Sequence, residues 1–292
     1  MNKRQKGLLV IFFVYSIAFI AALLVGLIFH YLHPIFIVLL SDVSATLVVY
    51  IFSLIYKNTS IYDPYWFVVP LFISVYYFLF SPFSVCIVRK IVVVGLTAIW
   101  SIKSTWHWAR RWHGLEDEDF RYELYRNNYK KLFGLINLFG LQLMPTIAVY
   151  LASLSFYPAI FIEGLSFNAI DIIAIIITSI AIIIEGVADQ QLYTFLQKRK
   201  GSGEIMKDGL WKYSRHPNYF GEILFWFGLY FFALAADISF WWTIIGPVFI
   251  LLLFNFVSIP LMDKRSLKRR PNYADHMEKV SKLLLLPTND DT

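Results

Sequence analysis

Hydrophobic residues in this chain fall into long runs that are separated by shorter polar segments. Eight runs are about 20 residues long, the length at which an α-helix crosses the hydrocarbon core of a bilayer. Pro70 and Pro82 interrupt the third run, and Arg89 and Lys90 interrupt the fourth. We therefore predict membrane-spanning helices over 8–28, 34–56, 65–83, 86–102, 132–152, 169–189, 218–236 and 240–261.

The same pattern predicts the fold class. No segment shows the alternation of polar and apolar positions that transmembrane β-strands need, so we predict an all-α, multi-pass transmembrane bundle of about seven to eight helices. The first apolar run is longer than the hydrophobic region of a signal peptide, which has about 7–15 residues, and no small-residue cleavage site follows it. We expect this run to be retained as the first span.

Positive charge is divided unevenly between the two sides of the predicted bundle. With eight crossings, the segments on the side of the N-terminus hold all of the 26 Lys and Arg residues except Arg89 and Lys90. Basic residues accumulate in cytoplasmic loops, so we predict a cytosolic N-terminus. The segments on that side are 1–7, 57–64, 103–131, 190–217 and 262–292.

Composition agrees with a membrane protein. Hydrophobic residues make up 58% of the 292 residues and charged residues only 16%, which is far from the balance of a soluble domain. The topology explains the net charge of +6, so we expect no nucleic-acid partner. The single cysteine, Cys86, excludes an internal disulfide, and the histidines lack the spacing of a zinc site, so we expect no metal.

Ionisable residues inside apolar helices indicate function in a membrane protein, because each costs roughly 2.5–3.5 kcal/mol at mid-bilayer. Glu185 and Asp189 are four residues apart and share one face of a predicted helix, with Gln190 and Gln191 beside them. Two acids on one face predict a binding site. The alternative is that Asp189 and the glutamines mark the point where the helix leaves the bilayer.

A second polar group lies at the start of the seventh predicted span, in GLWKYSRHPNYFGE. Pro217 suits the first turn of a helix, so Asn218 and Glu222 lie one turn apart on the same face. The free N–H groups of the helix start, with Arg215 and Lys212, suit a phosphate. A belt of interfacial anchors would explain the basic and aromatic residues, but it would not explain Asn218 and Glu222.

Two further polar segments lie on the same predicted side. The segment 262–292 is basic and ends in an apolar LLLLP, so we expect it to fold back onto the membrane, where it could cover a site. The segment 100–131 interleaves aromatic and basic residues, but its acidic run 116–119 would repel a nucleic-acid backbone. An amphipathic segment with its own salt bridges fits this stretch better. Acids, amides and arginines thus gather on one side of an apolar bundle, and we predict a cytosol-facing cofactor cavity that takes a nucleotide.

Several motifs of the chain resemble one family. EGVADQQLYTF, GLWKYSRHPNYFGE, NFVSIPLMDKR and RPNYADH resemble the DUF1295 family, as do KNTSIYDPYW and GLEDEDFRYELYR. This family is related to the C-terminal domain of steroid 5-alpha-reductases and, more distantly, to sterol reductases and isoprenylcysteine carboxyl methyltransferases. The resemblance covers about residues 40–287. It implies an N-terminal transmembrane helix extension over 1–39 and a steroid-reductase-like membrane domain over 40–292.

The resemblance implies an enzyme that holds NADPH and transfers its hydride to an enone. By position, it places Asn218 and Glu222 at the nicotinamide carboxamide and its ribose, and Asp189 and Glu185 on the adenosine side. It places Arg265 and Tyr273 at phosphate or adenine. The implied cofactor-binding residues are Glu185, Asp189, Tyr213, Arg215, Asn218, Glu222, Arg265 and Tyr273.

The chain departs from the family pattern at three positions. Steroid reductases place a glutamate four residues after a tryptophan to polarise the steroid ketone, but here Pro70 stands four residues after Trp66, which argues against 3-keto steroids as substrates. Asp263 stands where relatives commonly have Glu, and His276 where Tyr is usual.

We therefore predict an NADPH-dependent membrane reductase of a conjugated double bond in a lipid or sterol-like substrate, with Asp63 and Tyr122 as candidate catalytic residues. Two alternatives stay open: an S-adenosylmethionine-dependent lipid or prenylcysteine methyltransferase, and a non-catalytic membrane protein. The expected partners are a lipid-soluble small molecule and membrane lipids. The expected location is the endoplasmic reticulum membrane in a eukaryote, or the inner membrane in a bacterium.

Overall fold

The computed structural model of this protein describes residues 1–199, 201 and 203–288. Regular structure in these residues is helical, apart from one isolated bridge between Ser214 and Ser281. Lys200, one of the basic residues of the predicted segment 190–217, lies outside the described residues, as do the last four residues of 262–292. The fold class predicted from the sequence is confirmed.

A long helical segment stands at each of the eight predicted places. Three of these segments are built from shorter helices in succession, some of them π-helical or 3₁₀. The long segments are α1 (Lys3–Ile28), α2 (Pro34–Ile55), α3 (Tyr65–Phe80) with η1 (Thr59–Ile61) before it, α4 (Ile87–Arg111), α6 (Phe133–Leu135) with η2 (Ile136–Leu143) and α7 (Met144–Ser153), α8 (Ala169–Lys198), α9 (Pro217–Ala236), and η5 (Ile238–Ile244) with α10 (Ile245–Leu253), η6 (Phe254–Ser258) and α11 (Ile259–Arg269). The short connecting helices are α5 (Phe120–Asn128), η3 (Tyr157–Phe161), η4 (Gly209–Lys212) and α12 (Tyr273–Lys279).

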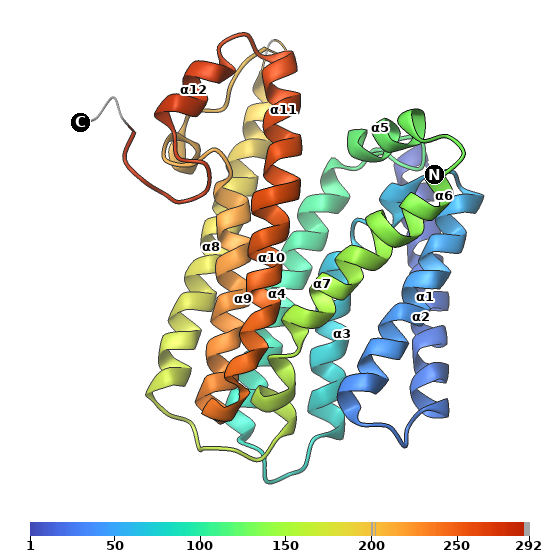
Figure 1. Ribbon diagram of the computed structural model, residues 1–292, viewed down its shortest axis with the longest axis vertical. Helices are drawn as coiled ribbons and strands as arrows, with labels where there is room; N and C mark the ends of the chain where they lie inside the picture. The colour runs from blue at the N-terminus through green and yellow to red at the C-terminus, as the bar shows by residue number, and fades with distance from the viewer. Residues whose placement is uncertain (200, 202, 289–292) are drawn as a thin grey trace.

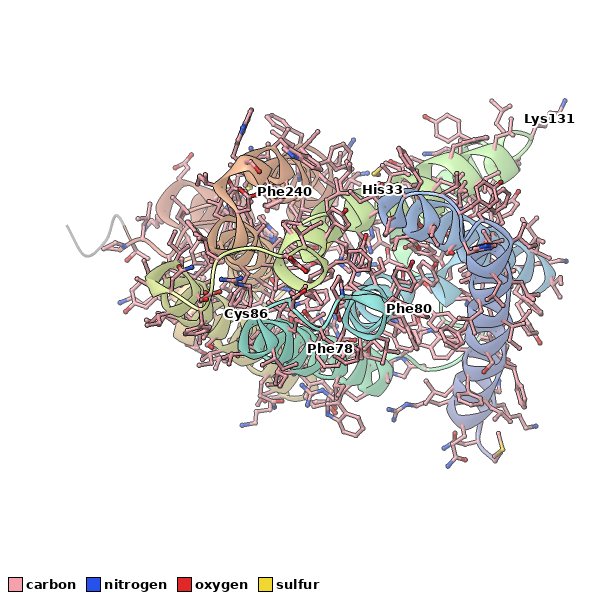
Figure 2. The ribbon with its side chains drawn as sticks, turned by 90° about the horizontal axis from the view of Figure 1, so that it is seen from below. His33, Phe78, Phe80, Cys86, Lys131 and Phe240 are labelled. Atoms are coloured by element: carbon pink, nitrogen blue, oxygen red, sulfur yellow. The ribbon has the colours of Figure 1, made fainter. Side chains whose placement is uncertain are left out.

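Successive long helices run in alternating directions along one axis (Figure 1). The N-terminus, α5 and α12 lie at the same end of the bundle, which we call the basic end. The opposite end, seen face-on in Figure 2, carries the connections marked by His33, Cys86 and Phe240. The basic segments predicted to share one side therefore meet at one end, and their cytosolic orientation stays a prediction.

Seven helical segments of the described residues are long and apolar enough to cross a membrane. The remaining long helix, α4, has 25 residues but is more polar, because it carries Arg89 and Lys90 near its start and Arg110 and Arg111 at its end. Large apolar side chains on the outside of the bundle, such as Phe12, Ile51 and Ile183, are exposed. An exposed apolar surface of this kind is what a lipid-facing helix needs.

Arg89, one of the two basic residues that break the charge pattern, lies in a closed internal network. Its guanidinium donates to both carboxylate oxygens of Asp171, at 2.7 and 2.8 Å, and to the carbonyls of Leu165, Ser166 and Ala235. Both side chains of the ion pair are at most 1% exposed. These acceptors compensate for the loss of water around the buried charge. Arg89 therefore joins the ends of α4, α8 and α9 rather than facing lipid.

Three helices continue well beyond their apolar runs. The structure extends α4 to Arg111, α8 to Lys198 and α11 to Arg269, where the predicted spans end at 102, 189 and 261. Backbone hydrogen bonds continue past the point where apolar side chains stop, so hydrophobicity marks the membrane core and not the helix end. These extensions carry polar side chains of α4, α8 and α11 into the basic end.

The acidic run 116–119 sits among its own cations at the basic end, as expected for an amphipathic segment. Glu116 pairs with Lys3 at 2.7 Å, and Asp119 pairs with Arg121 at 2.8 Å. Glu118 pairs with Arg126 at 2.7 Å, and its other contact is the backbone N–H of Thr59. This segment thereby ties α5 to the start of α3.

Candidate functional site

The candidate site is built on a close contact between α8 and α9. A Cβ added to Gly221 of α9 would lie 2.7 Å from the backbone nitrogen of Glu185 on α8. Two turns further along, a Cβ on Gly228 would lie 3.0 Å from the Cα of Thr178. Small residues let transmembrane helices approach this closely. The polar side chains of both helices are therefore brought together near the basic end.

Glu185 receives all of its bonds from α4. Trp100 donates its indole N–H at 2.8 Å, Ser104 donates its hydroxyl at 3.1 Å, and the Lys103 ammonium lies 2.7 Å away. The Glu185 residue is 3% exposed. Both of its carboxylate oxygens are thus occupied within the protein. The prediction that Glu185 contacts a cofactor stays a prediction, and the observed role is to hold α4 against α8.

Asp189 and Asn218 contact each other directly, and their predicted roles toward a cofactor stay predictions. The Asn218 side-chain amide donates to Asp189 Oδ1 at 3.2 Å, which joins the last turns of α8 to the first turn of α9. Glu222, one turn deeper on α9, accepts the indole N–H of Trp66 at 2.5 Å. The amide and the two acids therefore stand in one group, with Trp66 of α3 as its fourth member.

Asp263 of α11 is the acceptor for three side chains. It takes a hydrogen bond from Arg215 at 2.9 Å and one from the Tyr273 hydroxyl at 2.7 Å, and His216 Nε2 lies 3.1 Å from it. Arg215 is 8% exposed, and its Nε is buried without a hydrogen-bond partner. One N–H of a buried guanidinium at the start of α9 is therefore available to an acceptor.

The C-terminal segment packs onto the loop that carries Arg215. The Arg215 backbone N–H donates to the Ser281 carbonyl at 2.9 Å, and the Ser214 hydroxyl donates to the Leu283 carbonyl at 2.8 Å. Lys282 donates to the Asn255 carbonyl at 3.0 Å. The tail thus packs against the loop before α9, and its expected return to the membrane stays a prediction.

Two predicted cofactor residues lie at the edge of this group. The Arg265 guanidinium lies 3.7 Å from the centre of the Phe120 ring, where α11 meets α5. Tyr213 is 39% exposed, and its backbone carbonyl accepts the Leu286 N–H. Their predicted roles stay predictions.

The candidate catalytic residues Asp63 and Tyr122 contact each other. The Tyr122 hydroxyl donates to Asp63 Oδ1 at 2.6 Å. Burial and the adjacent Asp63 raise the pKa of Tyr122 well above its ordinary value, so the phenol keeps its proton. Burial opposes the charge of the neighbouring Arg121, but Tyr122, Asp119 and Tyr219 raise its pKa overall. Arg121 thus lies within electrostatic range of Tyr219, which stands in the first turn of α9.

Aromatic rings line the boundary between the polar group and the apolar bundle. Trp66 stacks on Phe254 with ring centres 6.2 Å apart, and Phe254 packs on Tyr219 at 4.7 Å. Tyr219 stacks in turn on His216 at 5.4 Å. A continuous row of rings, from Trp66 through Phe254 and Tyr219 to His216, therefore runs beside the polar group.

His276 lies near basic side chains at the basic end of the bundle. Burial lowers the pKa of His276 to about 4, and the charges of Lys207, Arg215 and Arg270 act in the same direction. The imidazole is therefore neutral at physiological pH.

Sequence reasoning missed two features of the site. The first is that Lys103 and Ser104 of α4 bind Glu185 together with Trp100. Residues 100, 103 and 104 share one face of a helix, and this spacing could have predicted a polar contact there. The contact between Trp66 and Glu222 joins residues 156 positions apart, for which the sequence carries no local signal.

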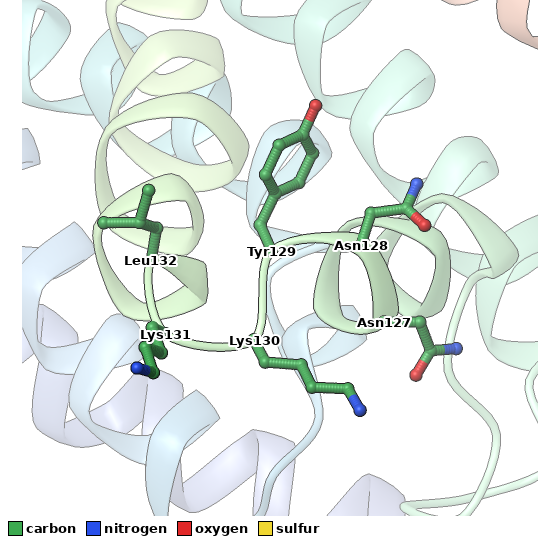
Figure 3. Close-up of a pocket in the computed structure, with 6 residues that line it drawn as sticks. All are labelled: Asn127, Asn128, Tyr129, Lys130, Lys131 and Leu132. Atoms are coloured by element: carbon green, nitrogen blue, oxygen red, sulfur yellow. The ribbon is translucent and has the colours of Figure 1, made fainter.

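A surface hollow lies elsewhere, at the connection between α5 and α6. It has a volume of about 450 Å³ and is lined by Asn127–Leu132 (Figure 3). None of the predicted site residues lines it. Within the described part of the chain, no three His, Cys, Asp or Glu side chains are placed to hold a metal ion.

The fold and the site define a multi-pass helical membrane protein with a group of acids, amides and arginines at one end of its bundle. The chain belongs to the DUF1295 family, described as "Protein of unknown function (DUF1295)", whose pattern matches residues 49–280. It is similar to the "Uncharacterized protein C594.04c" of Schizosaccharomyces pombe, with 26% identity over 250 residues that cover 77% of this chain and 72% of the relative. No solved structure matches the chain.

Proposed function

We propose that this protein is an NADPH-dependent membrane reductase that acts on a conjugated double bond of a lipid or sterol-like substrate. The observation that carries the proposal is the meeting of Asp189 with Asn218, one turn from Glu222, beside the buried and partly unpaired Arg215. The similarity of the motifs around Arg215 and Asn218 to steroid 5-alpha-reductases supports the same reaction class.

The residues present fit a phosphorylated dinucleotide. The buried Arg215 Nε lacks an acceptor, which a phosphate oxygen would supply. Asp189 suits ribose hydroxyls, because a carboxylate accepts their hydrogen bonds, and Asn218 suits a carboxamide, because an amide both donates and accepts. Arg265, Tyr273 and Tyr213 would complete the phosphate and adenine side, and Glu185 would keep α8 in place.

The bound cofactor would supply a hydride to the substrate. Glu222, held by the Trp66 indole, would fix the orientation of the nicotinamide end through its second carboxylate oxygen. Tyr122 keeps its proton, and its hydroxyl would turn from Asp63 to donate that one hydrogen bond to a substrate carbonyl, while Asp63 holds the hydroxyl in place before the substrate binds. The aromatic row from Trp66 to His216 would exclude water on the membrane side.

The experiment is a thermal-stability titration of the detergent-purified protein with NADPH, NADH and S-adenosylmethionine in parallel. A ligand that binds only the folded state adds about 2.7 kcal/mol of stability at 100 times its Kd. We expect stabilisation by NADPH. Stabilisation by S-adenosylmethionine alone would replace the proposal with a methyltransferase, and no stabilisation by any of the three would replace it with a non-catalytic membrane protein.

The variant Glu222→Gln tests in the same titration whether Glu222 takes part in NADPH binding. Glutamine keeps an oxygen that accepts the Trp66 N–H, so the fold is retained, but the second carboxyl oxygen is replaced by an amide nitrogen that donates instead of accepting. We expect weaker NADPH stabilisation in this variant. Glu116→Gln, at an exposed ion pair far from α9 in sequence, is the matched control and should leave the titration unchanged.

A further inference from the structure

A second group of buried polar residues lies in the other half of the bundle, on the buried face of α2. Asp42, Thr46 and Ser53 follow one another at helical spacing and are at most 5% exposed. Asp42 is the ninth residue of a 22-residue helix, well inside the span. The proposed reductase uses none of these groups. An ionisable residue at such depth is costly, and in membrane proteins it marks a functional site.

A chain of hydroxyl groups begins at Asp42. The Tyr65 hydroxyl donates to Asp42 Oδ1 at 2.7 Å and lies within hydrogen-bonding reach of Thr46. The Thr46 hydroxyl is 2.8 Å from that of Thr146, which is 2.7 Å from the hydroxyl of Tyr62. Each hydroxyl can donate one hydrogen bond and accept others. We call Tyr65, Thr46, Thr146 and Tyr62 the hydroxyl chain.

The π-helix η2 supports this polar column toward the basic end. Asn137 and Gln142 are five residues apart, the spacing that a π-turn aligns, and both donate to the Ser53 hydroxyl, at 3.1 and 2.9 Å. Both side chains are fully buried, and Gln142 Oε1 has no partner. π-Helical interruptions of α-helices occur frequently at functional sites.

Asp42 has no cationic partner among the described residues. Its Oδ2 is buried without a hydrogen bond. The titratable groups that interact with it are phenols: Tyr62 just after η1, Tyr65 of α3 and Tyr150 of α7. An isolated carboxylate in such surroundings costs far more than a neutral carboxylic acid, so the group takes up a proton.

We propose that Asp42 is a proton-binding site in the membrane interior, and that the hydroxyl chain exchanges its proton with the basic end through Tyr62. In each step a hydroxyl accepts one proton and releases its own to the next group, so one proton moves and every hydroxyl is restored. The next residue in the chain, the half-buried Asp63, would take the proton beyond Tyr62. This proposal does not depend on the reductase, because it concerns proton exchange by the resting protein.

Infrared difference spectroscopy of the reconstituted full-length protein tests both parts. A neutral carboxylic acid has a C=O stretch that a carboxylate lacks. We expect this band in the wild type and its loss in Asp42→Asn, in which the amide oxygen still accepts from Tyr65. After transfer to D₂O the band should shift, and the shift should be markedly slower in Tyr62→Phe. Tyr77→Phe removes another buried tyrosine hydroxyl and should leave the rate unchanged.

Two results would overturn the proposal. An unchanged carboxylic-acid region in Asp42→Asn means that Asp42 is ionised and holds no proton. Equal exchange rates in the wild type and in Tyr62→Phe mean that the hydroxyl chain does not carry the proton. Tyr65→Phe provides the test if Asp42→Asn does not fold, because loss of the hydrogen bond to the carbonyl must move a band that belongs to Asp42, and an unmoved band also overturns the proposal.

Discussion

Gly221 of α9 and Glu185 of α8 touch backbone to backbone, because a Cβ on the glycine would lie 2.7 Å from both the backbone nitrogen and the Cβ of the glutamate. This contact sets the distance between the two helices that carry Asp189 and Asn218. We expect Gly221→Ala to push α9 away from α8 and to cost about 1–3 kcal/mol of stability, the usual cost of overpacking. Thermal unfolding in detergent measures the loss.

Gly95→Ala is the matched control for this substitution. Gly95 is also inside a long helix, α4, but a Cβ on it would meet no atom within 4 Å. Alanine there should be neutral or stabilising by up to about 1 kcal/mol, because of its higher helix propensity. A destabilised Gly95→Ala together with an unaffected Gly221→Ala would contradict the packing argument.

Removal of one partner of the buried Arg89–Asp171 pair should be strongly destabilising. Arg89→Met leaves an unpaired carboxylate that is fully buried, and Asp171→Asn leaves an unpaired guanidinium, so we expect each to cost about 3–5 kcal/mol. In the double variant no charge is left unpaired. Its loss should be smaller than the sum of the single losses by more than about 0.5 kcal/mol. Additive losses would mean that the two charges act independently.

His276 should make the protein less stable in mild acid. Because burial holds the pKa of His276 at about 4, below its ordinary value of 6.5, the unfolded chain binds a proton more readily between these pH values. The contribution of this group to the free energy of unfolding is full above pH 6.5 and falls as the pH drops toward 4. His276→Gln should flatten this part of a melting-temperature profile, and an unchanged slope between pH 4 and 6.5 in this variant would contradict the prediction.

Trp66→Phe should separate the hydrogen bond of Trp66 from its packing. Phenylalanine keeps a ring against Phe254 but has no N–H to donate to Glu222, so a buried carboxyl oxygen loses its partner at a cost of about 1–3 kcal/mol. We also expect NADPH to stabilise this variant less than the wild type. Trp106→Phe, at a tryptophan that is 63% exposed, is the control. An equal loss of stability in this variant would mean that the hydrogen bond from Trp66 to Glu222 makes no specific contribution.

The hydrophobic pattern predicts the bundle well, because each span has to satisfy the same bilayer thickness. Helix ends are predicted poorly where the chain leaves the apolar core, as α8 shows by continuing nine residues past 189, to Lys198. A shared face of α9 for Asn218 and Glu222 is predictable, because the two residues stand one helical turn apart. The partners Trp66 and Asp263 are not, because they come from other helices and only the packed bundle brings them near.

The bonds of Arg215 also fix the order in which this region can form. Ribosomal synthesis proceeds from the N-terminus, so α9 leaves the ribosome before Asp263, Tyr273 and Ser281 exist. Until α11 and α12 arrive, the guanidinium has no counter-charge and the loop before α9 has no tail to pair with. The basic end of α9 is therefore completed last, after its membrane span has already been made.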